Sequence, residues 1–265
     1  MVRLGIFGRL TPTGLYSHHP LLRQMDDKVI ILIDYDNLDE LMRRRGLSHV
    51  MRCLLDVLSI QCGVRERRAL CRMYGGWFYG TSLSRRAQRL ITELSHDFPC
   101  TMDLVGHGEG QTMFVQAELA RALACDTSIE LTHTYRRRSI PPSLRCKRLP
   151  FRGCRLPAQC PIAVIDPFIY EESCTVDRCE VSPAEVLIRE EQKMVDSMLI
   201  VDLIHFAETT DAQLVVVSAD DDFWPGIRFV LLRGARVIHV VSRRKQPKYE
   251  RYRRLKTDSY TQVKI

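Results

Sequence analysis

Short apolar runs that end in acidic residues dominate the hydrophobic pattern of this chain. The run 29–33 leads into Asp-Tyr-Asp-Asn at 34–37, and the run 214–217 leads through Ser-Ala into three consecutive aspartates at 220–222. Apolar runs of this length, rich in β-branched residues, are typical of strands that are buried on both faces. The pattern therefore predicts an α/β fold with a mostly parallel central sheet flanked by helices.

The second of these runs opens a β-α-β unit, with a helix expected over 223–232, a stop at Gly234 and a strand over 236–241. Ligands of open α/β sheets bind at the carboxyl ends of the strands. One or two of the aspartates are also explained as helix caps. If the two acid-tipped strands are neighbours, however, their carboxylates converge where only a cation would hold them ionised together. An all-oxygen site of this kind suits Mg²⁺ or Mn²⁺ better than Zn²⁺.

A further acid is expected from a helix. In the segment SPAEVLIREEQKMVDSMLIVDL, Ser182 and Glu185 form a capping box that predicts one long helix from Ser182. Because Asp196 lies several turns after Ser182, such a helix must project above the sheet, or it begins later than the cap signal suggests. At helical spacing Asp196 shares a polar face with Lys193, whereas Asp202 lies on a different face. Asp196 is therefore a candidate site residue, with an ordinary helix ion pair to Lys193 as the alternative.

Three blocks, IDYDN, KMVD with LIVDL, and SADDDFWPGIR, together resemble the signature motifs of NYN domains, a branch of the PIN-like nucleases. Ala219 stands where that family usually has glycine. The resemblance implies a PIN-like three-layer fold over 26–265, with an N-terminal extension at 1–25 and a Cys/Arg/Pro-rich insertion at about 133–181. The matching positions are Asp34 and Asn37, then Lys193, Val195 and Asp196, then Ser218, Asp220, Asp222 and Phe223.

The resemblance also implies a metal-dependent endoribonuclease. In such an enzyme bound Mg²⁺ or Mn²⁺ activates water and stabilises the leaving oxygen. The expected catalytic and metal-binding residues are Asp34, Asp196, Asp220 and Asp222. Asn37 and Ser218 would position water or phosphate, and Lys193 would neutralise phosphate or tune Asp196. Asp221 is expected to point away from the site, because neighbouring residues at a strand end alternate faces.

Two other functions remain open from the sequence. The segment LIDYDN also resembles the nucleophile loop of haloacid-dehalogenase-type phosphatases, in which Asp34 would attack phosphorus and Asp36 would be the acid. The nuclease is preferred, because Asp196 and Phe223 have no role in the phosphatase. The other alternative is a non-catalytic RNA-binding protein that retains a PIN-like fold.

The balance of 39 Lys and Arg against 32 Asp and Glu gives a net charge of +7. This charge suits a polyanionic partner such as RNA. No apolar run is long enough for a membrane span and the first residues lack a secretory signal, so we expect a cytoplasmic protein; its oligomeric state is not predicted. Basic stretches at 43–47, 135–139 and 242–256 compete for the RNA contact. The third is the leading candidate, with Arg243, Arg244, Lys245, Lys248, Arg251, Arg253 and Arg254 beside two tyrosines.

The chain has ten cysteines. Cys53, Cys62, Cys71, Cys100 and Cys125 lie among apolar neighbours and are expected to be small buried residues. The other five lie in the insertion, which has little apolar periodicity from which to build a core. A structural Zn²⁺ could stabilise it, with His133 as a further candidate ligand. The candidate zinc ligands are Cys146, Cys154, Cys160, Cys174 and Cys179.

Overall fold

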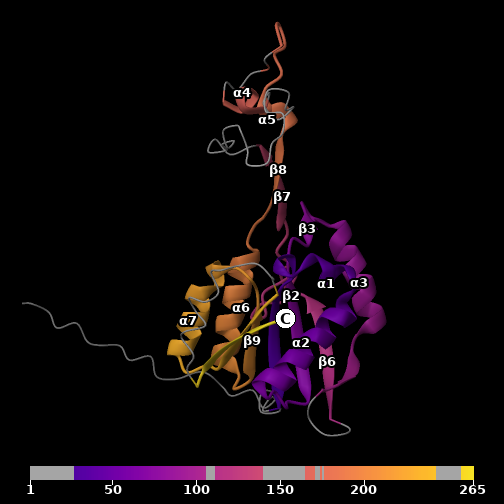
Figure 1. The fold of residues 1–265 in the computed structure, drawn as a ribbon, viewed down its shortest axis with the longest axis vertical. Helices are drawn as coiled ribbons and strands as arrows, with labels where there is room; N and C mark the ends of the chain where they lie inside the picture. Colours follow the sequence, from indigo (N-terminus) through magenta and orange to yellow (C-terminus); the bar gives the residue numbers. More distant parts are fainter. Residues whose placement is uncertain (1–26, 106–110, 140–164, 171–173, 175, 243–257) are drawn as a thin grey trace, which may run out of the picture.

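The structure, a computed structural model, describes residues 27–105, 111–139, 165–170, 174, 176–242 and 258–265. The predicted N-terminal extension at 1–25 lies outside these residues. A seven-stranded mixed sheet flanked by helices forms the body, so the predicted α/β class is confirmed (Figure 1). In spatial order its strands are β11 (Tyr260–Lys264), β10 (Val237–Val241), β9 (Gln213–Val217), β1 (Lys28–Asp34), β2 (Arg68–Tyr74), β6 (Thr112–Leu119) and β5 (Cys100–Asp103).

The strand pairings are parallel from β11 to β6, and β5 pairs antiparallel with β6 at one edge. The two acid-tipped strands, β1 and β9, are neighbours at the centre, as the sequence hypothesis required. Residues 29–33 of β1 are fully buried, because helices cover both faces of the sheet. Polar groups from the two central strands therefore meet where β1 and β9 end. This carboxyl-end side of the sheet is the candidate edge, as distinct from the outer strand β5.

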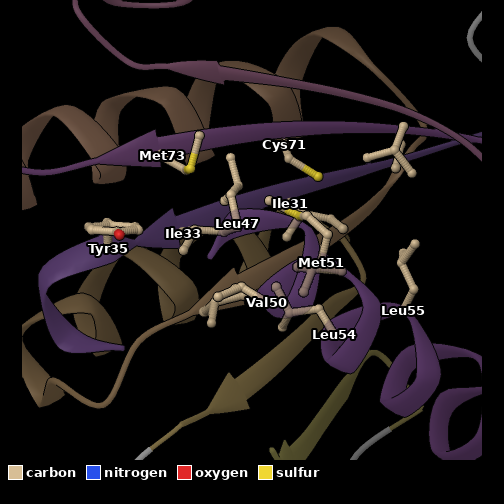
Figure 2. Close-up of a cluster of buried hydrophobic side chains, with 14 of the residues drawn as sticks. Ile31, Ile33, Tyr35, Leu47, Val50, Met51, Leu54, Leu55, Cys71 and Met73 are labelled. Carbon is tan, nitrogen blue, oxygen red and sulfur yellow. The ribbon is translucent and has the colours of Figure 1, made fainter. Parts of the chain in front are cut away.

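One face of the sheet packs against α2 (Leu47–Cys62) and α3 (Arg85–Asp97). Alternate residues of β1 and β2, including Ile31 and Cys71, face side chains of α2 such as Met51 (Figure 2). The short turn η2 (Tyr35–Asn37) and helix α1 (Glu40–Arg44) connect β1 to α2. These elements place the segment that follows Asp34 beside the start of α2.

The other face packs against α6 (Val195–Thr209) and α7 (Trp224–Leu232). The remaining alternate residues of β1, Ile30 and Leu32, join this second core. The short turn η5 (Asp221–Phe223) connects β9 to α7, as the predicted β-α-β unit required. Helix α6 thus lies on the same side of the sheet as the turn that carries the three consecutive aspartates.

A second sheet, in the order β4-β3-β7-β8, extends from the body as a narrow ribbon (Figure 1). Helices α4 (Ile165–Tyr170) and α5 (Pro183–Val186) lie at the far end of this ribbon. The strands are β3 (Phe78–Tyr79), β4 (Ser82–Leu83), β7 (Tyr135–Ser139) and β8 (Ile188–Gln192). The basic stretch at 135–139 therefore forms a strand.

The prediction of one long helix from Ser182 is wrong, and the alternative that the helix with Asp196 begins later than the cap signal is confirmed. The capping box of Ser182 and Glu185 is present, but α5 ends at Val186 and α6 begins only at Val195. Between them β8 pairs antiparallel with β7, where acidic residues of β8 oppose arginines of β7. This pairing with β7 stabilises the strand over the helix that local spacing favours.

Two smaller expectations also need correction. Of the five cysteines expected to be buried, only Cys71 is; Cys53, Cys62 and Cys100 are of intermediate exposure, and Cys125 is exposed in a loop after β6. His133, expected as a strand residue when not a ligand, has a left-handed backbone (φ 58°) and lies before β7. Among the described residues, no helix is both long and apolar enough to cross a membrane.

Candidate functional site at the sheet edge

The carboxyl ends of β1 and β9 bring the first and third sequence blocks together. Ile33 pairs with Val217, so Asp34 and Ser218 follow at neighbouring positions on adjacent strands. The Ser218 hydroxyl donates a hydrogen bond to Asp34 Oδ2 at 2.9 Å. The side-chain amide of Asn37 donates to the same oxygen. Two of the predicted supporting residues therefore hold the Asp34 carboxylate directly.

Asp34 is only 2% exposed. The pKa of Asp34 is raised to about 6, chiefly by burial and to a smaller extent by the negative charge of Asp196, against the hydrogen bonds from Asn37 and Ser218, which lower it. Burial disfavours the ionised carboxylate, whereas donors that face it favour ionisation. With a pKa of about 6, this carboxyl changes charge close to neutral pH. A nearby cation would favour its ionised form.

The three consecutive aspartates have different partners. Asp220 caps the turn η5 and accepts a hydrogen bond from the backbone N–H of Asp222 at 3.1 Å. The charges that act on Asp196 are those of Asp220 and Asp222, whereas the charge of Asp221 acts on His239. That Asp221 points away from the candidate site stays a prediction.

Asp196 lies in the first turn of α6, next to the left-handed residue Met194 (φ 68°). Partial burial and the negative charges of Asp220 and Asp222 raise the pKa of Asp196. Asp196 also raises the pKa of Asp34, so the four predicted acids interact although they come from three separate segments. The beginning of α6 therefore supplies the acid that the sequence placed farther along a longer helix.

Lys193 does not pair with Asp196. Its ammonium group lies 3.4 Å from Glu191 Oε1, and its backbone N–H donates to Thr134 at 3.0 Å. Lys193 thus lies at the junction between the ribbon and α6. The alternative of a helix ion pair between Lys193 and Asp196 is wrong, because Lys193 precedes the helix.

His239 on β10 contacts the backbone of Ser218, and this role was not predicted. Its Nε2–H donates to the Ser218 carbonyl at 3.0 Å, and its Nδ1 accepts from the Tyr260 hydroxyl at 3.1 Å. Burial lowers the pKa of His239 to about 4, although the Ser218 carbonyl and the charge of Asp221 raise it. The one polar residue in the apolar run 237–241 was the available sequence signal.

Asp36 is also held by partners that the sequence did not identify. One oxygen forms ion pairs with Arg43 at 3.6 Å and with Arg86. The other accepts from Gln192 and from the backbone N–H of Gly76 at 3.4 Å. Asp36 therefore connects η2 to α1, to α3 and to the base of the ribbon. Its carboxylate is neutralised by arginines, which does not suit the general acid of the phosphatase alternative.

The four aspartates suit a hard divalent cation by donor chemistry, because all their ligand atoms are carboxylate oxygens. Burial, and then the charges of neighbouring aspartates, raise the pKa of Asp34 and of Asp196. Among the described residues, however, no three His, Cys, Asp or Glu side chains are grouped closely enough to hold a metal ion. The carboxylates of Asp34 and Asp220 accept hydrogen bonds from the protein instead.

The remaining predicted sites lie partly outside the described residues. The basic residues at 243–256 do so, as do Cys146, Cys154 and Cys160. Cys174 and Cys179 are free thiols of intermediate exposure, and the zinc site stays a prediction. Comparison with family models, with curated proteins and with solved structures found no match, so a function has to be inferred from the residues and their geometry.

Proposed function

We propose that this protein is a metal-dependent endoribonuclease with a PIN-like fold, which hydrolyses RNA phosphodiester bonds at the edge formed by β1, β9 and α6. The observation that supports this proposal is the interaction of four aspartates from three segments, with Asp34 buried against Asn37 and Ser218. Structural capping explains Asp220, but it does not explain a buried, high-pKa carboxylate on the neighbouring strand.

Each of these residues has a proposed role. Asp34, Asp196, Asp220 and Asp222 would hold Mg²⁺ or Mn²⁺, which when bound supplies an activated water and charge stabilisation at the scissile phosphate. Asn37 and Ser218 fix the orientation of the Asp34 carboxylate through their hydrogen bonds. His239 in turn fixes the Ser218 backbone through its carbonyl, which keeps the hydroxyl on Asp34.

The experiment uses the full chain, a fluorescently labelled single-stranded RNA, and Mg²⁺ or Mn²⁺ against EDTA. We expect metal-dependent cleavage that Asp34→Asn and Asp220→Asn each reduce by more than the roughly 10- to 100-fold that loss of an outer-shell partner costs. Asp211→Asn is the matched control, because Asp211 is exposed and lies before the amino end of β9, at the other end of the strand from Asp220. Unchanged cleavage in both Asp34→Asn and Asp220→Asn would rule out this site.

The same proteins distinguish the alternatives. Hydrolysis of p-nitrophenyl phosphate without RNA cleavage, abolished by Asp34→Asn, would identify the phosphatase. RNA binding without hydrolysis of either compound would identify the non-catalytic protein. The ion pairs of Asp36 with Arg43 and Arg86 favour the nuclease over the phosphatase.

A further inference from the structure

A basic cavity lies beside the turn η2, on the opposite side of the sheet from helix α6. Its volume is about 410 Å³, and it is lined by residues of α1, the start of α2, and α3. Its charged lining residues are Arg43, Arg44, Arg86, Arg89, Glu40 and Glu93. Four arginines against two glutamates leave an excess of two positive charges in the lining.

The two glutamates are already engaged. Glu40 pairs with Arg44 at 2.5 Å, and Glu93 accepts from the backbone N–H of Leu47 at 3.0 Å, at the start of α2. Asp36, behind the lining, compensates Arg43 and Arg86. Arg89 is exposed and forms no ion pair or hydrogen bond within the described part of the chain. The cavity therefore holds a guanidinium without a carboxylate partner.

Arg43 and Tyr35 lie together on the wall of the cavity. The guanidinium carbon of Arg43 lies 6.0 Å from the centre of the Tyr35 ring. The Nε–H of Arg43 is buried and has no acceptor among the described residues. Burial and the charge of Glu93 raise the pKa of the Tyr35 phenol, whereas the charges of Arg43, Arg89 and Arg86 lower it. Arg89 therefore remains the exposed guanidinium of the lining without a carboxylate partner in the described part of the chain.

The cavity lies close to the candidate catalytic edge. Tyr35 lines it and directly follows Asp34, so consecutive residues of the backbone belong to the cavity and to the candidate edge. The acid cluster repels a polyanion until metal is bound, so affinity for RNA must come from bases near that edge. Planar guanidinium groups bind phosphate through paired hydrogen bonds.

We propose that this arginine cavity binds a phosphate group of the RNA strand next to the scissile phosphodiester. That the bound strand is RNA rests on the proposed function. That a phosphate binds rests on the cavity. The phosphate is either a terminal monophosphate or an internal phosphodiester, and both present at least two non-bridging oxygens to Arg89.

The test measures binding of a labelled single-stranded RNA to the full chain in EDTA, where cleavage cannot contribute. We expect Arg89→Gln to weaken binding by about tenfold, and to reduce the slope of log affinity against log salt by about 0.7, the value for one phosphate contact on a single strand. Arg85→Gln is the matched control, because Arg85 is exposed on the same helix but does not line the cavity. Both variants should unfold at the wild-type temperature, because both side chains are exposed.

Oligomers with a 5′-phosphate and a 5′-hydroxyl distinguish the two phosphate sources. A loss confined to the 5′-phosphorylated oligomer identifies a terminal phosphate, and an equal loss on both identifies an internal one. Wild-type affinity in Arg89→Gln on both oligomers, or an equal loss in Arg85→Gln, overturns the proposal. Binding in EDTA also separates the two ideas: wild-type protein that binds RNA through Arg89 but never cleaves it contradicts the proposed function alone.

Discussion

Ser218 holds Asp34 from the neighbouring strand, with its hydroxyl 2.9 Å from Asp34 Oδ2, although 184 residues separate them in the sequence. The same serine accepts a hydrogen bond on its carbonyl from His239. Two buried ionisable groups, Asp34 and His239, are thereby connected through one residue, and burial shifts the pKa of each toward its neutral form. The stability of the metal-free protein should therefore depend on pH in two opposite ways.

The first prediction concerns Asp34. Its folded-state pKa of about 6 lies above the ordinary 3.8, so between these values the native state retains a proton that the unfolded chain has lost. The contribution of Asp34 to the free energy of unfolding therefore falls as pH rises through this window. We therefore compare the free energies of unfolding of Asp34→Asn and of wild type in EDTA by urea unfolding. From pH 4 to pH 8 the difference should change by about 2 to 3 kcal/mol in favour of Asp34→Asn. A stability difference that does not change with pH would contradict the shifted pKa.

The second prediction concerns His239 and has the opposite sign. Its pKa of about 4 lies below the ordinary 6.5, so between these values the unfolded chain binds a proton that the native state excludes. Its contribution to stability is lost as pH falls from about 6.5 to about 4, by an amount on the order of 3 kcal/mol. His239→Gln keeps a donor for the Ser218 carbonyl but cannot titrate. Its free energy of unfolding should fall less on acidification than that of wild type; an equally steep fall would assign the effect to other groups.

Much of the fold could be predicted from the sequence, because β1, β9 and β10 are apolar runs whose burial requires helices on both faces. The convergence of acids from β1 and β9 could be predicted from the same pattern, because neighbouring parallel strands end at the same side of the sheet. The ribbon could not be predicted. Its strands β7 and β8 lack apolar alternation, and a capping box marks where a helix begins but not where it ends.

The contacts of Asp36 could not be predicted from the sequence for a related reason. Its partners Arg43, Arg86 and Gln192 come from three different elements, and no local spacing connects them. The buried partners of Asp202 are equally distant in the sequence. Tyr74 and Ala124 donate hydrogen bonds to its two oxygens at 2.6 and 2.7 Å, and such pairs are known only once the strands are ordered.

The third prediction compares two aspartates on α6. Asp202 is 0% exposed and pairs with Arg72 at 3.2 Å, besides its bonds with Tyr74 and Ala124. Asp202→Asn leaves Arg72 with Glu118 as its remaining carboxylate partner, and loss of the charged acceptor should cost about 1 to 3 kcal/mol of unfolding free energy. Asp196→Asn, the same substitution nearly two turns earlier, removes repulsion from Asp220 and Asp222 and should cost nothing at pH 7.5 in EDTA. Equal losses in urea unfolding would show that Asp196 is structural.

The last prediction concerns the spacing between α6, which carries Asp196, and α7, which follows the turn with Asp220 and Asp222. Gly226 of α7 is buried against Ile200 of α6: a Cβ there would lie 3.1 and 3.2 Å from its two γ carbons. Gly226→Ala gains up to about 1 kcal/mol of helix propensity but overpacks this contact, which typically costs about 1 to 3 kcal/mol.

Removing the γ carbons of Ile200 should reverse the sign of the effect of Gly226→Ala on the free energy of unfolding. In an Ile200→Ala background we expect Gly226→Ala to be stabilising, with a coupling energy of about 1 to 3 kcal/mol in the double-mutant cycle. Ile204→Ala is the control background, because Ile204 packs in the same core and is not among the nearest atoms to Gly226. Because the contact sets the distance between the acids of α6 and those of η5, Gly226→Ala alone should also reduce stabilisation by Mn²⁺ in thermal unfolding, and Ile200→Ala should restore it. Additive effects in both backgrounds would show that α6 and α7 can move apart without strain, so that their spacing does not fix the acid cluster.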